Sequence, residues 1–136
     1  MRAYQKILPE VELLGASLAA ISPQTPDNTL STVEKNNLTF EVLSDLGNRV
    51  ARQFGLVFQV GEPVRTVYAS RFGIDLARSN GDDSWELPIP GTFVIARKGT
   101  IRLAYVDVDY TTRLEPSEIV DCLRRLAKEE RLDTLN

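Results

Sequence analysis

A proline ahead of two apolar runs joined by a glycine turn constrains the fold of this 136-residue chain more than any other feature. Residues 93–96 are continuously apolar, as in an interior strand, the polar turn 97–100 contains a glycine, and residues 101–108 run back as a second strand. Because proline cannot donate to a strand ladder, we expect Pro90 at the first position of its strand. X-Pro bonds are also the bonds most often found cis, and we predict a cis bond between Ile89 and Pro90.

Length and composition predict one ordinary domain. Of the 136 residues 43% are apolar, which is enough for one hydrophobic core. The formal charge is −3 and the basic residues are scattered, so we expect neither a nucleic acid nor an anionic membrane surface as a partner. No apolar run reaches the roughly 18 residues that span a bilayer, and the first residues lead into no signal-peptide core. We therefore expect a cytoplasmic protein.

Residues with strong intrinsic reactivity are few. Cys122 is the single cysteine, so no disulfide can form within the chain. Histidine, the commonest metal ligand and the commonest general base, is absent from the sequence. The sequence therefore argues against a metal site and against Ser-His-Asp chemistry, and we expect no cofactor.

The first half of the chain alternates helices and strands. Residues 2–14 have apolar side chains at helical spacing, with Pro9 as a kink or a new start and Gly15 as a stop. The elements expected next are an apolar strand over 17–22, a helix up to residue 37, a strand over 40–44 and a helix over 49–54 closed by Gly55. This order predicts an α/β fold with parallel strands.

The helix that ends near residue 37 has turn residues ahead of it and few apolar ones within it. We expect Asp27 or Asn28 to cap its N-terminus, and Leu30 and Val33 to face inward.

The second half of the chain is less regular. We expect a short strand over 56–60, a helix over 63–72 ended by Gly73, and a polar loop around 80–83, so that residues 61–86 form an insertion. The closing helix begins at Pro116 with Glu115 as its cap, and its inner face contains Ile119, Val120, Leu123, Leu126 and Leu132.

Four motifs, in this order along the chain, resemble peroxiredoxins of the alkyl hydroperoxide reductase and thiol-specific antioxidant family. They are the strand 18–22 before Pro23, the segment 40–45, the helix 48–55 and the stretch 90–95 with its Lys98-Gly99 turn. The resemblance implies an antioxidant oxidoreductase with a thioredoxin fold, in which helices flank a mixed sheet. It also implies that Pro90 stands at the cis-proline position and that Thr92 lines the place of the reactive thiol.

The resemblance also defines what we expect to be missing. In that family the peroxidatic cysteine stands in the first turn of a helix that follows a central strand, and residues 2–9 resemble only the later part of that helix. We therefore interpret residues 1–136 as one incomplete thioredoxin-like domain without the central strand and without an assigned catalytic residue. A start of the gene upstream of Met1, with the cysteine included, is another interpretation.

Cys122 is the one thiol that remains. Peroxide reduction needs a thiolate with a lowered pKa in an electropositive, accessible setting, whereas Cys122 lies on the apolar face of the closing helix. We interpret it as a small core residue. The alternative is a redox-active thiol, whose disulfide would have to be intermolecular.

Other polar groups have an ordinary explanation beside a functional one. Asp107 and Asp109 suit a solvated strand end or a cation site. Asp82 and Asp83 beside Trp85 are interpreted either as a polar loop or as a recognition patch. Arg49 and Arg52 are interpreted either as ordinary surface residues or as partners of a thiolate.

Two function classes follow. The first is a peroxiredoxin-family protein, inactive in this form, whose thiol reductant is unknown. The second is a non-catalytic binding or assembly module that uses the segment from Pro63 to Glu86 for a protein contact. Loss of a central strand would leave backbone groups unpaired, so we expect the strands at 18–21 and 93–96 to pair directly, or a homodimer partner to cover them.

Overall fold

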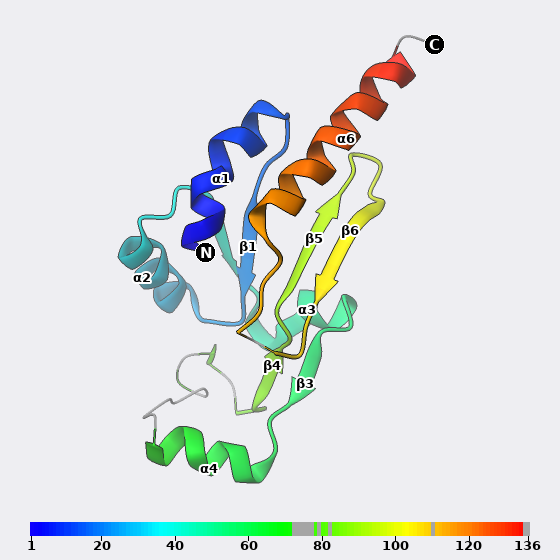
Figure 1. Cartoon of the computed structure of the whole chain (residues 1–136). Coiled ribbons are helices and arrows are strands. Elements are labelled where there is room, and N and C mark those ends of the chain that lie inside the picture. The colour runs from blue at the N-terminus through cyan, green and yellow to red at the C-terminus, as the bar shows by residue number, and fades with distance from the viewer. Residues whose placement is uncertain (72–77, 79, 82, 110, 135–136) are drawn as a thin grey trace. The chain divides into compact units, whose positions relative to one another are not determined.

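The computed structural model describes residues 1–71, 78, 80–81, 83–109 and 111–134. The chain divides into two compact units. The hairpin unit comprises Met1–Leu18, Leu38–Phe40 and Pro90–Asn136, and the parallel-strand unit comprises Ala19–Asn37 and Glu41–Ile89. Figure 1 shows the elements of both units in chain order.

The hairpin unit contains the two strands expected around Gly99. β5 (Gly91–Ile95) and β6 (Ile101–Val106) are antiparallel, and their register runs from Gly91 opposite Val106 to Ile95 opposite Ile101. Gly99 has a φ of +82°, so the turn uses the left-handed conformation that glycine adopts without strain. The predicted hairpin is confirmed.

Two helices complete this unit, α1 (Arg2–Leu13) and α6 (Pro116–Thr134). α1 runs through Pro9 as one helix, and Gly15, with a φ of +75°, follows its last turn. There Gly15 N donates to Glu12 O at 2.9 Å and Ala16 N to Val11 O at 3.1 Å, a Schellman pair that satisfies the last carbonyls.

The core of the hairpin unit lies where α6 packs on the hairpin. Its buried cluster consists of Val94, Leu114, Ile119, Cys122 and Leu126. Tyr4 and Ile7 of α1 pack against the cluster as partly buried residues. Each large side chain that is fully removed from water contributes about 1.5–3 kcal/mol, so this cluster stabilises the unit together with its other buried apolar residues, Leu8, Val11, Leu38, Phe40 and Val120. Leu132, expected on the inner face of α6, is 63% exposed, which differs from the prediction.

The parallel-strand unit begins with the predicted strand–helix–strand alternation. β1 (Ala19–Ser22) and β2 (Glu41–Ser44) pair in parallel, and α2 (Pro26–Asn36) connects them. After β2 come the 3-10 helix η1 (Leu46–Asn48) and the helix α3 (Arg49–Gln53). The parallel pairing predicted from apolar strands is therefore confirmed.

Two details of α2 differ from the prediction. Its N-cap is Thr25, with Pro26 as the first helical residue, because proline suits a position whose N–H needs no intrahelical partner. Leu30 is 58% exposed while Thr29 is buried, since the Thr29 hydroxyl shares a hydrogen bond of 2.9 Å with the Ser44 hydroxyl of β2. α2 therefore turns a polar side chain toward the strand.

The remainder of this unit contains β3 (Val57–Gln59), α4 (Glu62–Arg71) and β4 (Glu86–Pro88). β4 is antiparallel to β3, with Val57 opposite Pro88. Leu87 and Pro88 therefore pair with β3 and are not part of the hairpin formed by residues 91–106. The predicted helix end at Phe72 and Gly73 and the loop residue Asp82 lie outside the described residues.

The bond between Ile89 and Pro90 is trans, because no peptide bond among the described residues is cis, and the cis prediction is wrong. Ile89 N donates to Leu56 O at 2.7 Å, so extended pairing continues up to the proline. The trans form is the ordinary state of an X-Pro bond.

Within the described residues, each sheet has two strands: β1 with β2, β3 with β4, and β5 with β6. The strand at 19–22 and the strand at 91–95 lie in different units, so the direct pairing expected between 18–21 and 93–96 stays a prediction. Within its own unit, each strand pairs with one neighbour. No helix in the described part of the chain is long and apolar enough to cross a membrane.

Candidate functional site

The sequence pointed to Pro90 and Thr92, and the structure places a tyrosine beside the latter. Tyr4 lies in the first turn of α1, on the face that packs toward the hairpin. Its hydroxyl lies 3.3 Å from Thr92 Oγ1 on β5 and donates to the carbonyl oxygen of Leu114 at 3.3 Å. Three segments far apart in sequence therefore meet at one phenol. In the helical pattern of residues 2–14, Tyr4 is one of the apolar positions, and no local signal predicts this contact.

Thr92 is partly exposed, as is Pro90 two residues earlier. A hydroxyl here can bind a small polar molecule or orient one, but it is not a redox group. The assignment of Thr92 to the wall of a thiol pocket stays a prediction.

Cys122 lies away from solvent. Its side chain belongs to the buried cluster of the hairpin unit, and the residue is 3% exposed. A peroxide would have to enter this core to reach the sulfur, which removes the access that a peroxidatic thiol needs. The position agrees with the interpretation of Cys122 as a core residue.

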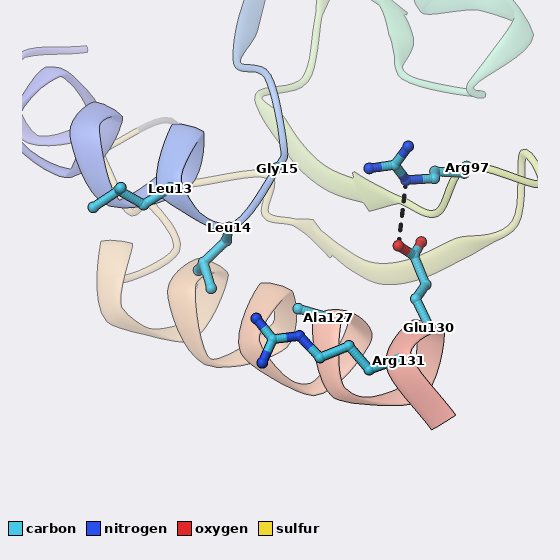
Figure 2. A pocket seen from close by; sticks show the side chains of 7 residues that line it. All are labelled: Leu13, Leu14, Gly15, Arg97, Ala127, Glu130 and Arg131. Carbon is cyan, nitrogen blue, oxygen red and sulfur yellow. Dashed lines mark ion pairs between the residues drawn. The ribbon is translucent and has the colours of Figure 1, made fainter. Parts of the chain in front are cut away.

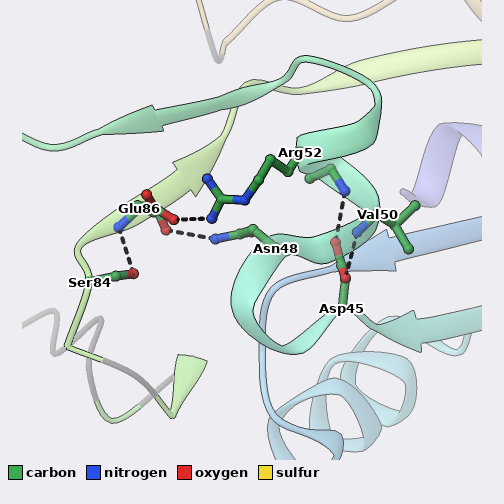
Figure 3. Close-up of polar contacts among 7 residues, drawn as sticks. Asp45, Asn48, Val50, Arg52, Ser84 and Glu86 are labelled. Atoms are coloured by element: carbon green, nitrogen blue, oxygen red, sulfur yellow. Dashed lines mark hydrogen bonds and ion pairs between the residues drawn. The ribbon is translucent and has the colours of Figure 1, made fainter.

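In the parallel-strand unit, Arg52 contacts a carboxylate of its own unit. It forms an ion pair with Glu86 of β4, and the hydrogen bond and charge of Glu86 raise the pKa of Arg52 (Figure 3). A guanidinium paired in this way stabilises the approach of β4 to α3. Arg49, the other arginine considered, is exposed at the start of α3.

Two further residues near this ion pair were not predicted (Figure 3). Asp45 is buried, and its carboxylate accepts from Val50 N at 3.0 Å and from Ala51 N at 2.9 Å, which caps α3. Asn48 is 1% exposed, and its side-chain amide donates to Glu86 O at 3.1 Å. The only sequence signal for these contacts is the run of turn-forming residues at 44–48, SDLGN.

Asp107 and Asp109 form local turns. Asp107 Oδ1 accepts from Asp109 N at 2.9 Å, and Asp109 Oδ1 accepts from the Thr111 hydroxyl at 2.6 Å and its amide at 2.9 Å. The hydrogen bonds from Thr111 lower the pKa of Asp109. Within the described ranges no group of three or more acidic, histidine or cysteine side chains could hold a metal ion, and the choice between a solvated strand end and a cation site stays a prediction.

Trp85 forms a cation–π contact with Arg65. The guanidinium carbon of Arg65 lies 5.4 Å from the centre of the Trp85 ring, and Arg65 Nε donates to Val60 O at 2.8 Å. Asp83 is exposed beside it. The described residues thus fold Trp85 onto its own unit.

A surface cavity of about 450 Å³ lies at the C-terminal end of α1 in the hairpin unit (Figure 2). Leu14 and Ala127 line its apolar part, and Arg97 pairs there with Glu130 at 3.3 Å. Its charged lining consists of the guanidinium groups of Arg97 and Arg131 and the carboxylate of Glu130. It lies at the opposite end of α1 from Tyr4.

Comparison with known proteins defines the class of protein. The model of the AhpC/TSA family matches residues 1–104, which is most of the chain, and the chain therefore belongs to this family. Small sheets flanked by helices agree with a thioredoxin-like fold of the α/β class, as predicted.

One curated relative is a Haemophilus influenzae protein that carries the name peroxiredoxin bcp. It is 40% identical over 47 residues, a match that covers 35% of this chain and 30% of the relative. The match thus spans less than a third of that protein's length. Together with the family match it confirms the peroxiredoxin-like resemblance.

Proposed function

We propose that this chain functions in thiol-dependent peroxide reduction. We also propose that its 136 residues do not reduce peroxide by themselves. Membership of the AhpC/TSA family supports the reaction class. The burial of Cys122, the single thiol of the chain, is the observation that carries the second half of the proposal. A thiolate attacks peroxide only where the peroxide can reach the sulfur, and the apolar cluster around Cys122 closes off that access.

Peroxide consumption tests this function directly. The 136-residue protein with excess dithiothreitol and hydrogen peroxide should show the rate of the reductant alone, and Cys122→Ser should not change that rate. Labelling of the native thiol by a disulfide reagent should become fast only after denaturation. Turnover that Cys122→Ser abolishes would refute the proposal and make the chain an active thiol peroxidase.

A second candidate, a non-catalytic assembly module, is favoured by apolar side chains left exposed on the strands. Ile21 and Leu43 are opposite each other in the β1–β2 ladder and are 51% and 49% exposed. Ile95 and Ile101 are opposite each other in β5–β6 and are similarly exposed. Such faces beside open strand edges attract a partner.

We propose that this partner is a second copy of the chain. We also propose that the protein is cytoplasmic, because free thiols such as that of Cys122 stay reduced in the cytoplasm. Alternatively, the assembly module, taken as a single domain over residues 1–136, contacts a protein partner through the insertion at residues 61–86. Light scattering at micromolar concentration should give the mass of a dimer. Ile95→Lys should lower that mass, whereas Lys98→Gln, in the adjacent turn, should not. A monomer at all concentrations would refute the homodimer.

A further inference from the structure

The cavity at the C-terminal end of α1 combines an apolar wall with cationic groups (Figure 2). Leu14 after α1 and Ala127 of α6 form the apolar wall, and Arg97 of the β5–β6 turn and Arg131 of α6 line the same space. Its volume of about 450 Å³ lies in the range typical of small-molecule sites, about 300–1,000 Å³. An apolar wall beside guanidinium groups suits an organic anion.

The charged groups of this cavity have an excess of positive charge. Arg97 and Arg131 are cations and Glu130 is the one anion that lines the cavity, whereas the whole chain has a formal charge of −3. Glu130 Oε2 contacts Arg97 at Nε, at 3.3 Å, and the Arg97 side chain is 75% exposed. A guanidinium bound at Nε still presents its two Nη groups, whose N–H bonds match the two oxygens of a carboxylate.

Gly15 brings the Arg97 guanidinium close to the apolar wall. A Cβ atom built on Gly15 would lie 3.5 Å from Arg97 Nη2, so the guanidinium lies against the backbone that follows α1. Leu14, which precedes Gly15 in the chain, lines the cavity beside it. A ligand in this space therefore meets a cation and an apolar surface at the same time.

We propose that this cavity binds a monoanionic aliphatic carboxylate. Its carboxylate group pairs with Arg97 and Arg131, and its hydrocarbon part lies on Leu14 and Ala127. A single negative charge matches the positive excess of the lining, whereas a dianion brings its second charge close to Glu130. This inference goes beyond the proposed function, because it involves neither a thiol nor a peroxide.

An NMR titration of the isotope-labelled 136-residue protein tests this inference, with sodium octanoate, n-octanol and inorganic phosphate as probes. Octanoate should shift the amide signals of Gly15, Arg97 and Ala127 to saturation, at concentrations where the other two probes leave them unchanged. The alcohol has the same chain without the charge, and phosphate has charge without an apolar part. Equal binding of octanoate and n-octanol, or shifts confined to other residues, would overturn the inference.

Two arginine variants locate the binding site. Arg97→Gln should weaken octanoate binding by about tenfold, the lower end of the value of a hydrogen bond to a charged group. Arg102→Gln is the matched control, because Arg102 also pairs with a glutamate of α6, Glu129 at 2.8 Å, but does not line the cavity. It should leave the affinity unchanged, and equal losses in the two variants would contradict the site.

Glu130→Gln distinguishes a binding site from an ion pair that only stabilises the fold. The variant removes the negative charge of the lining, so octanoate should bind about two- to fivefold more tightly. An unchanged or weaker affinity would show that Arg97 serves the ion pair alone and would overturn the inference. If Arg97→Gln does not fold, Glu130→Gln and the comparison of octanoate with n-octanol still decide it.

Discussion

The two units bury different kinds of side chain. Of the buried apolar residues described, all but Ala51 and Val60 lie in the hairpin unit. All the buried polar residues described lie in the parallel-strand unit: Thr29, Asp45, Asn48 and Asn80. Apolar burial is non-directional, whereas a buried polar group must find a partner of defined geometry. The hairpin unit should therefore respond to changes of volume, and the parallel-strand unit to loss of single hydrogen bonds.

The largest effect is expected in the core of the hairpin unit. Leu126→Ala removes a buried side chain of α6 and should lower the free energy of unfolding by about 3 kcal/mol, from lost burial plus the cavity left behind. Leu132→Ala, on the exposed part of the same helix, should change it by less than about 0.5 kcal/mol. Urea denaturation measures both. Equal losses would show that α6 does not stabilise the unit through its buried face.

Asn48 should give the next largest effect, in the parallel-strand unit. Its φ is +54°, and its amide bonds Glu86 O, so Asn48→Ala loses a hydrogen bond and strains the backbone, at a cost of about 2 kcal/mol. Asn48→Gly keeps the backbone freedom and should cost about half as much. Denaturation curves of the two variants separate the cost of the lost hydrogen bond from the cost of the backbone strain. Equal costs would mean that the left-handed conformation contributes nothing.

Removal of the Asp45 cap should have a smaller effect. Asp45→Ala leaves the amides of Val50 and Ala51 without their acceptor, which should cost about 1 kcal/mol and expose α3 to faster hydrogen exchange. Asp27→Ala, at a helix start where no side-chain cap bond forms, is the control. Faster exchange confined to the hairpin unit would contradict the assigned role.

The smallest effect concerns pH. The pKa of Asp109 is lowered in the folded protein, so its contribution is fully present above the ordinary value of 3.8 and is lost as the pH falls through the folded value. Asp109→Asn should therefore flatten the decline of the melting temperature below about pH 4. Thermal unfolding of both proteins in acid measures this. An unchanged slope would show that the Thr111 hydrogen bonds do not stabilise the fold.

Local signals in the sequence were sufficient for most elements. Periodicity predicted α1 and α6, the apolar runs predicted the parallel strands, and the glycine at 99 predicted the hairpin turn. These signals act within one or two turns of chain, where spacing and turn residues restrict the backbone. The pairing of β4 with β3, the Asp45 cap and the contact of Asn48 with Glu86 depend on residues that come together only after folding.

The hairpin entered through Pro90 shows where the division lies. Sequence patterns alone were sufficient to predict the two strands, the glycine turn, the family resemblance and the apolar face on which Cys122 lies. Tertiary structure decided the trans bond at Ile89–Pro90, the burial of the thiol and the meeting of Tyr4 with Thr92 and Leu114. A pattern of apolar residues specifies which face is buried, but the direction of a hydroxyl hydrogen depends on acceptors that other segments bring to it.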